Sequence, residues 1–348
     1  MKFKKISIGK IKKLGILFLP VLALIVISSL VILLGKTAGK VEEISVKLDD
    51  ETFKMVQNKD FSKISVYISQ SGEIVKVDLE DYVLGIISGE MPAAFNEEAL
   101  KAQAVVARTY AVKRLIYPCE KAEGADICDS VHCQVYMNKK DRMNSWDKNK
   151  AQDYWDKLQR AVSSTKGEVL TYNGELVLYP QFFSTSWGKT EDCSAVFSLS
   201  LPYLKSVSSP GEDEAPKYKS KTIISSAQFI NKINSNFKGA NLNISNLRNS
   251  VKISSRNQGG SVNEIKIGDT SIKGTQFRSV FELNSANFNI SFTNKAVVIE
   301  TSGYGHGVGM SQWGANAMAE KGAKYNEILS HYYNGIQLNN ISELKFVR

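Results

Sequence analysis

The feature that most constrains this chain is an uncharged, mostly apolar run at residues 14–35. As a helix rising about 1.5 Å per residue, these 22 residues would span roughly 33 Å, enough to cross the hydrocarbon core of a bilayer. The alternative is a cleaved signal peptide, whose apolar region is usually shorter, about 7–15 residues. The small residues Thr37, Ala38 and Gly39 could form the cleavage site of a signal peptidase. The length of the apolar run nevertheless favours a transmembrane anchor.

Lysines indicate the orientation of that anchor. Six of them precede the apolar run: Lys2, Lys4, Lys5, Lys10, Lys12 and Lys13. Only Lys36 and Lys40 follow it closely, so the positive-inside rule places the N-terminus in the cytoplasm and everything beyond residue 36 outside it. The expected organisation is a basic cytoplasmic segment at 1–13, an anchor at 14–35, a stalk at 36–60 and one extracytoplasmic domain at 61–348.

The net charge of +9 comes from this N-terminal region. The first forty residues contain eight lysines and no acid, and the other 308 residues carry 36 basic and 35 acidic groups. The exported part is therefore almost neutral, and its bulk charge does not favour nucleic acid as a partner. Its location also argues against cytosolic substrates and nucleotide cofactors.

Hydrophobic patterning predicts an α+β fold, in which a mixed sheet and helices form a substrate cleft. Alternation at 64–68 and 74–77 predicts one hairpin, and Asn173-Gly174 between two apolar runs predicts another with a type I′ turn. Residues from about 220 to 294 are rich in Ser, Asn and Lys, which indicates a more variable α+β segment. Helices are expected at about 79–89, 96–117, 150–164, 312–321 and 326–333.

Glu90 is the first candidate for chemistry. It stands where the helix expected at 79–89 is interrupted, with Pro92 following and apolar residues on both sides. Partial removal from water raises the pKa of a carboxyl group from about 4.3, and a general acid at neutral pH needs such a shift. The alternative from the residues alone is a turn or capping acid with no chemical role.

Two polar residues lie on apolar faces of the helix expected at 96–117. Gln103 and Arg108 have only Ala, Val and Leu as their neighbours three and four positions away. If buried, both need hydrogen-bonding partners. Either they are satisfied internally, with Arg108 paired to a carboxylate, or they line a cleft; the residues alone leave both interpretations open.

The third candidate is the glycine-rich segment at 303–315, which follows an expected strand and precedes an expected helix. Glycines at 303, 305, 307 and 309 allow positive φ or close approach of the backbone to a ligand. The spacing fails the dinucleotide-binding pattern, because Val308 stands where the third glycine would be needed. A binding loop is the better interpretation, with His306, Ser311 and Gln312 as polar contacts.

The cysteines allow two structural interpretations. Cys119, Cys128, Cys133 and Cys193 could form two disulfides in an oxidising compartment. Alternatively, Cys119, Cys128, His132 and Cys133 offer up to four ligands within fifteen residues, a set suited to zinc, although the spacing is not a strong zinc-finger signature. Both interpretations stay open, and in either case the role is structural rather than catalytic.

Six segments together resemble the stage II sporulation protein D family, the membrane-anchored peptidoglycan lytic transglycosylases of endospore formers. They lie in the order found in that family, from about residue 64 to the C-terminus. One departure is Trp187, where a small residue is expected before Gly188, and Cys119 and Cys193 do not belong to the core pattern. The matching segments are 81–92, 98–111, 132–136, 183–191, 202–207 and 305–315.

The resemblance implies that Glu90 is the catalytic acid and base in cleavage of the MurNAc–GlcNAc β-1,4 bond. It also implies a substrate of glycan strands without stem peptides, and cooperation with a sporulation amidase and membrane partners of the engulfment machinery at the mother-cell membrane. No cofactor is required for this chemistry, and zinc would be structural. The further cleft residues carried over from the family are Arg108, Tyr203, Lys205, Gln134, Ser184, Ser186, His306 and Gln312.

Two other functions remain as alternatives. Domains related to this family are described as amidase enhancers, so the chain could be a non-enzymatic glycan-binding module that activates a cell-wall amidase. A weaker alternative is hydrolysis by zinc held at the Cys/His cluster.

Overall fold

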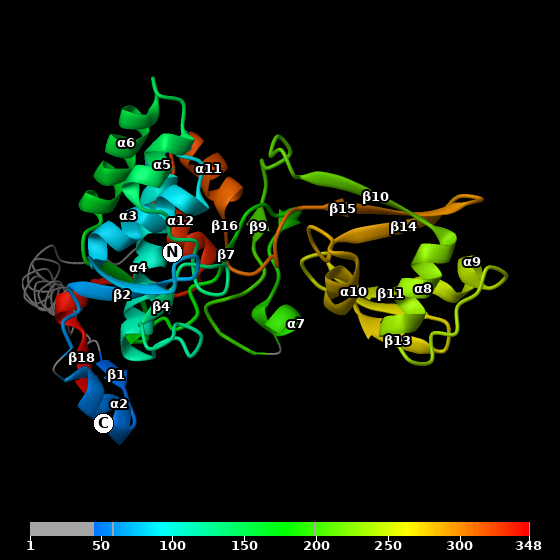
Figure 1. The fold of residues 1–348 in the computed structure, drawn as a ribbon, viewed down its shortest axis with the longest axis horizontal. Helices are drawn as coiled ribbons and strands as arrows, with labels where there is room; N and C mark the ends of the chain where they lie inside the picture. The colour runs from blue at the N-terminus through cyan, green and yellow to red at the C-terminus, as the bar shows by residue number, and fades with distance from the viewer. Residues whose placement is uncertain (1–44, 58, 198, 348) are drawn as a thin grey trace, which may run out of the picture. The chain divides into compact units, whose positions relative to one another are not determined.

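The structure is a computed structural model that describes residues 45–57, 59–197 and 199–347 (Figure 1). The expected cytoplasmic segment and anchor, residues 1–13 and 14–35, lie outside the described residues. Among the residues described, no helix combines the length and the apolar character needed to cross a membrane.

The main hydrophobic core is built around helix α4 (Glu97–Ile116). Asn96 caps its N-terminus by accepting a hydrogen bond from the Glu98 N–H. Apolar residues lie on nearly all sides of the helix, so that it is buried by neighbours around its circumference rather than along one stripe. Those neighbours are α3 (Leu79–Glu90), α6 (Ala151–Ser164), α11 (Gln312–Glu320) and α12 (Tyr325–Tyr332).

Both predicted hairpins are confirmed. Strands β2 (Lys63–Ile68) and β3 (Glu73–Asp78) pair antiparallel, and β4 (Ile127–Cys128) runs parallel to β2. Strand β5 (Glu168–Tyr172) pairs with β6 (Glu175–Leu176) and with β17 (Ile336–Asn340).

The second hairpin turns through positive φ angles. They are +51° at Asn173 and +75° at Gly174, as a type I′ turn requires. Its second strand is short and ends at Leu176.

Residues 219–302 contribute a second core with its own sheets. In one sheet β15 (Ala296–Ser302) lies between β10 (Lys219–Ser225) and β14 (Phe288–Phe292). In the other, β12 (Val262–Ile267) lies between β11 (Val251–Arg256) and β13 (Thr270–Lys273). Helices α8 (Ser226–Asn236), α9 (Leu247–Ser250) and α10 (Gly274–Phe281) complete it. This segment thus contains both helices and strands.

Four phenylalanines fill the centre of that second core. Phe277 lies 4.5 Å from Phe281 and 4.8 Å from Phe288 between ring centroids, and Phe229 stacks on Phe281 at 5.0 Å. The carboxylate of Glu191 connects this core to the rest of the chain, because it accepts hydrogen bonds from the N–H groups of Gly259 and Ser261.

The N-terminal described residues pair with the C-terminus. Strand β1 (Ser45–Lys47) runs parallel to β18 (Lys345–Val347), which follows the 3₁₀ helix η1 (Ile341–Glu343), and α2 (Asp50–Val56) follows β1. Val46, Leu48 and Val56 are buried in the main core. The second half of the expected stalk therefore contains regular elements that contact the main core.

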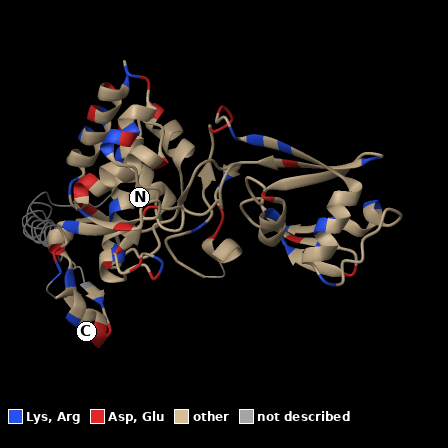
Figure 2. Cartoon of the chain, in the orientation of Figure 1, with Lys and Arg blue, Asp and Glu red and all other residues tan. Residues whose placement is uncertain are grey.

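Short elements complete the description. They are α5 (Lys139–Ser145), β7 (Phe182–Phe183), β8 (Gly188–Lys189), α7 (Cys193–Phe197), β9 (Ser208–Ser209) and β16 (Met310–Ser311). The α+β class is confirmed, but the strands form several small sheets instead of one mixed sheet. Basic and acidic residues are mixed along most elements, consistent with the near-neutral charge outside the first forty residues (Figure 2).

Candidate functional site

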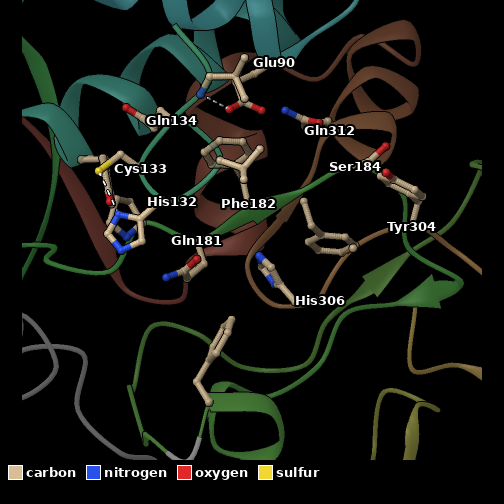
Figure 3. A pocket seen from close by; sticks show the side chains of 17 residues that line it. Glu90, His132, Cys133, Gln134, Gln181, Phe182, Ser184, Tyr304, His306 and Gln312 are labelled. Atoms are coloured by element: carbon tan, nitrogen blue, oxygen red, sulfur yellow. Dashed lines mark hydrogen bonds between the residues drawn. The ribbon is translucent and has the colours of Figure 1, made fainter. Parts of the chain in front are cut away.

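Glu90 is the last residue of α3. The helix ends there because Met91 is extended, with φ −121° and ψ 146°, immediately before Pro92. One carboxylate oxygen, Oε1, accepts a hydrogen bond of 2.8 Å from the N–H of Val135 (Figure 3). Burial raises the pKa of Glu90 above its usual value, and the Val135 hydrogen bond opposes that rise. The structure thus agrees with the expectation of a partly desolvated carboxyl group at a helix interruption.

Two pockets meet at Glu90. The first has a volume of about 600 Å³, and five of the predicted catalytic and substrate-binding residues line it: Glu90, Gln134, Ser184, His306 and Gln312. The second, of about 370 Å³, shares Glu90, Ser184, Tyr304 and Gln312 with the first. Volumes of this order suit small ligands or sugar units. Among the residues lining the two pockets, Glu90 is the single carboxylate.

Glutamine side chains surround the carboxyl group. The labelled side chains of Glu90 and Gln312 point toward each other in Figure 3. Gln312 Nε2 lies 3.5 Å from Gln103 Oε1, and Gln134 Oε1 lies 3.5 Å from the Tyr82 hydroxyl. The Nε2 atoms of Gln103 and Gln134 are buried and have no hydrogen-bond partner among the described residues. An unpaired buried donor of this kind costs about 1–3 kcal/mol.

His306 contributes a neutral imidazole to the first pocket. Its Nδ1 accepts a hydrogen bond from the Val308 N–H at 3.1 Å, and its ring lies between Phe183 and Phe197. Burial, together with the neighbouring positive charge of Arg278, lowers the pKa of His306 to about 4. At neutral pH it can donate a hydrogen bond from Nε2 but does not supply a charge.

The glycine-rich segment forms a tight loop beside these residues. Gly303, Gly305, Gly307 and Gly309 all have positive φ, as the sequence suggests. At Gly309, where φ is +78°, a Cβ atom would overlap the carbonyl oxygen of Gln181. Close packing of this loop against β7 therefore requires glycine at that position.

Four residues that the resemblance suggests for the cleft do not line either pocket at Glu90. Arg108 is fully buried, and its Nε and Nη2 donate to the carboxylate of Glu80 at 2.9 and 2.7 Å. This arrangement agrees with the internal alternative that the residues left open for Arg108, and its cleft role stays a prediction. Arg108 points from α4 toward Glu80, which lies in the first turn of α3 and so at the opposite end of that helix from Glu90.

The other three are also engaged elsewhere. Ser186 donates to the buried Glu212 carboxylate at 2.7 Å. The Tyr203 ring lies 5.5 Å from that of Tyr172, and Lys205 forms a 3.0 Å ion pair with Asp192. The departure at Trp187 lies outside the pockets as well, since its indole N–H donates to the Gly259 carbonyl in the second core.

Several pocket residues were not predicted from the sequence, and three of them carry polar or charged groups that matter below. Tyr304 borders both pockets, and Arg142 and Lys217 line the second. Tyr304 lies inside the glycine-rich segment, so the sequence motif could have identified it. Arg142 lies in the polar helix α5, and Lys217 lies in the turn just before β10; no sequence pattern marks either residue as part of a site.

The Cys/His cluster lies at the edge of the first pocket. Nδ1 of His132 is 3.5 Å from the sulfur of Cys119, 4.0 Å from that of Cys128 and 3.7 Å from that of Cys133. All four candidate ligand atoms lie within 4.8 Å of one another. Zn–S and Zn–N bonds of about 2.3 and 2.0 Å in a tetrahedron imply S···N separations of about 3.5 Å, so the donor set fits zinc. All four cysteines of the chain are free, and Cys193 stands apart from the cluster.

Comparisons with known proteins agree with one another. A sequence family described as "Stage II sporulation protein" matches residues 67–172. Over 281 residues the chain is 37% identical to stage II sporulation protein D of Bacillus subtilis (strain 168), covering 79% of this chain and 78% of that protein. It is 36% identical over 279 residues to the protein of the same name from Bacillus amyloliquefaciens, with the same coverage. The amidase enhancer of Bacillus subtilis (strain 168) is 30% identical over 301 residues, which are 73% of this chain and 40% of that protein.

Proposed function

This chain belongs to the stage II sporulation protein D family, and from that premise we propose that it is a lytic transglycosylase acting on peptidoglycan during engulfment. It cleaves the MurNAc–GlcNAc β-1,4 bonds of glycan strands and leaves 1,6-anhydro ends. The observation that carries the proposal is the position of Glu90. It is a single, partly buried carboxyl group with a raised pKa, at the junction of two pockets large enough for successive sugars.

The mechanism needs one carboxyl group used twice. Protonated Glu90 gives its proton to the glycosidic oxygen, and the bond between that oxygen and C1 of the MurNAc residue breaks. The C6 hydroxyl of the same MurNAc then attacks C1, and the carboxylate of Glu90 accepts the hydroxyl proton. Glu90 returns to its protonated state, no water is consumed, and no second carboxylate is required, in contrast to the usual glycosidase pair.

The surroundings of Glu90 suit this cycle. Burial favours the protonated form, which the first step requires. The Val135 N–H binds Oε1 and orients the carboxyl group, so the proton is carried by Oε2. Gln134 and Gln312 border the same pocket and position the sugar through their amide groups. His306, being neutral, acts as a hydrogen-bonding group rather than as a second acid.

The anchor sets where this chemistry takes place. Residues 14–35 hold the chain in the engulfing mother-cell membrane as a single span with the N-terminus in the cytoplasm, and the domain beyond the stalk faces the cell wall. Its substrates are strands from which a sporulation amidase has removed the stem peptides, and membrane proteins of the engulfment machinery are its further partners.

Zinc belongs to this proposal as a structural ion. Cys119, Cys128, His132 and Cys133 would hold it, and when bound it would cross-link the segment that precedes Val135. That segment matters to the site, because the Val135 N–H holds Glu90 and the Val135 carbonyl oxygen packs closely against Gly89, where a Cβ atom would lie only 2.7 Å from it. The cluster therefore fixes the wall of the pocket that buries the carboxyl group.

The test uses the full-length protein with glycan strands from which stem peptides have been removed. Mass spectrometry should detect new 1,6-anhydromuramyl ends. Glu90→Gln should lower the rate about 10²–10⁴-fold, the usual contribution of a general acid. Glu264→Gln, on an exposed part of β12, removes the same charge as a control and should leave the rate unchanged. An absence of anhydro products, or full activity in Glu90→Gln, would refute the enzymatic proposal or the residue assignment respectively.

A second candidate function rests on the similarity to the amidase enhancer. In that case the chain binds glycan and stimulates an amidase without cutting the strands. Both functions predict glycan binding at the pockets, so the discriminating measurement is the amidase rate in the presence of Glu90→Gln. Undiminished stimulation by this variant, together with no new chain ends from the unmodified protein, would favour the activator.

A further inference from the structure

The second pocket at Glu90 contains two cationic side chains for which the described part of the chain provides no acidic partner. Arg142, from α5, and Lys217, just before β10, both line it. Among the described residues, neither side chain takes part in an ion pair with a carboxylate. Buried charges in proteins are normally paired, so the half-buried and unpaired Arg142 indicates an anionic ligand, and the exposed Lys217 adds a second positive charge to the same pocket.

Arg142 is the more constrained of the two. It is half-buried, and its Nε atom is buried without a hydrogen-bond partner in the described chain. Its guanidinium stacks 4.6 Å from the Trp146 ring, and Nη1 makes only long contacts, 3.4 Å to Ser145 Oγ and 3.9 Å to Met137 Sδ. A planar guanidinium with unfilled donors matches a carboxylate in geometry as well as in charge.

Lys217 brings a second charge to the same pocket from another part of the chain. It is exposed, and its Nζ lies 4.7 Å from the centre of the Tyr304 ring. Tyr304 borders both pockets, so Lys217 lies close to the junction at which Glu90 is found. The ring contact orients the ammonium group but does not neutralise it.

Glu90 is not the missing partner. A cation in contact with its carboxylate would lower its pKa, whereas burial raises the pKa of Glu90, and the single opposing influence is the Val135 N–H. The two cations are therefore available to a ligand that occupies the pocket beside Glu90.

We propose that Arg142 and Lys217 bind the free lactyl carboxylate of a muramic acid residue in the second pocket, and so select strands that lack stem peptides. This inference rests on the proposed function, because the glycan strand supplies the anion. In an intact strand the stem peptide joins that carboxyl group through an amide bond, which removes the negative charge and adds bulk. Removal of the peptide exposes the carboxylate that the two cations recognise.

The experiment measures binding, so that it does not depend on cutting. Full-length protein carrying Glu90→Gln is titrated by calorimetry with denuded glycan fragments and with the same fragments after their lactyl carboxylates have been converted to methylamides. This Glu90→Gln protein, the parent of the variants below, should bind the free carboxylate form about tenfold more tightly than the methylamide. A factor of that size is the usual effect of a charged hydrogen-bonded pair. Adding Arg142→Gln and Lys217→Gln should reduce that ratio to about one.

Two controls keep the result interpretable. Lys252→Gln removes an exposed positive charge from β11, which belongs to the second core, and should leave the ratio at its parental value. Lys217→Gln alone, at an exposed position, should lower the ratio about threefold even if the Arg142 variant does not fold.

Equal binding of the two fragments by the parent would overturn the inference and leave the proposed cleavage untouched. A ratio that survives the double substitution would overturn the assignment to these residues. The two proposals can also fail separately. If the preference for the free carboxylate disappears in the double variant, carboxylate recognition is supported. If the unmodified protein at the same time makes no new chain ends, the enzymatic proposal is refuted.

Discussion

The buried ion pair between Arg108 and Glu80 allows a prediction that separates structure from catalysis. Arg108 is 0% exposed, whereas the Glu80 side chain is 27% exposed and also accepts a hydrogen bond from the Gly167 N–H. The two partners therefore leave different defects when each is removed. Without Arg108, the carboxylate can return to water; without Glu80, the guanidinium stays buried with no anion.

We expect Arg108→Met to lower the free energy of unfolding by about 2 kcal/mol, because it removes charged hydrogen bonds to Glu80 and one to the Glu168 carbonyl. Glu80→Ala should cost more, about 3–5 kcal/mol, as for a buried charge that loses its partner. At about 2 °C per kcal/mol for a domain of this size, the melting temperatures should fall by about 4 °C and about 6–10 °C. The double variant should be more stable than Glu80→Ala alone.

Differential scanning calorimetry on the purified full-length protein measures these shifts, and the cleavage rate per folded molecule is measured on the same samples. Lys221→Met, which removes a half-exposed pair with Glu300, is the control and should cost less than about 1 kcal/mol. If Arg108→Met proved more destabilising than Glu80→Ala, the solvation argument would be wrong. If it abolished cleavage at an unchanged melting temperature, Arg108 would belong to the catalytic site after all.

Three further predictions follow from the site. Because burial raises the pKa of Glu90 and the first step needs its proton, kcat/KM should fall as pH rises through that pKa. The free energy of unfolding should also fall as pH rises from the unfolded-state pKa of Glu90 to its folded-state pKa. Glu90→Gln should remove this slope from melting temperatures measured as a function of pH. Gly309→Ala should lower the free energy of unfolding by more than about 2 kcal/mol in chemical denaturation, because the added Cβ overlaps the Gln181 carbonyl oxygen and φ is positive. Gly188→Ala should lower it by about 1 kcal/mol, because φ is also positive there but no described atom lies within 4 Å of the added Cβ. Equal losses of stability would contradict the packing argument. Elemental analysis should find one zinc per chain, lost in Cys128→Ser and retained in Cys193→Ser, and zinc-free protein as isolated would refute the metal proposal.

Local features could be predicted from the sequence with good accuracy because neighbouring residues determine them. The Asn173-Gly174 turn adopts positive φ at both residues, because asparagine and glycine tolerate that conformation better than other residues do. Asn96 caps α4 through its own side chain, and Glu90 is desolvated at the end of α3 because Pro92 stops the helix among apolar residues. Such features depend on a few consecutive residues and survive in many tertiary contexts.

Pairing across the chain was less predictable. The apolar environment of Arg108 on α4 indicated burial, but not whether a cleft or a carboxylate would face it; the packing of α3 on α4 decided in favour of Glu80. The resemblance named Lys205 and Ser186 for the cleft, and in the structure these side chains are occupied by Asp192 and Glu212.

The sequence by itself determined the near-neutral charge beyond the first forty residues, the family to which the chain belongs and the identity of Glu90 as its chemical candidate. Only the tertiary structure decided what surrounds that carboxyl group. Val135, Gln312, Arg142 and Lys217 come from separate segments of the chain, and they border the pockets at Glu90 because burial of the hydrophobic core brings distant segments together. Spacing along the chain does not encode such contacts, because the favourable free energy of folding comes from apolar area removed from water across the whole domain.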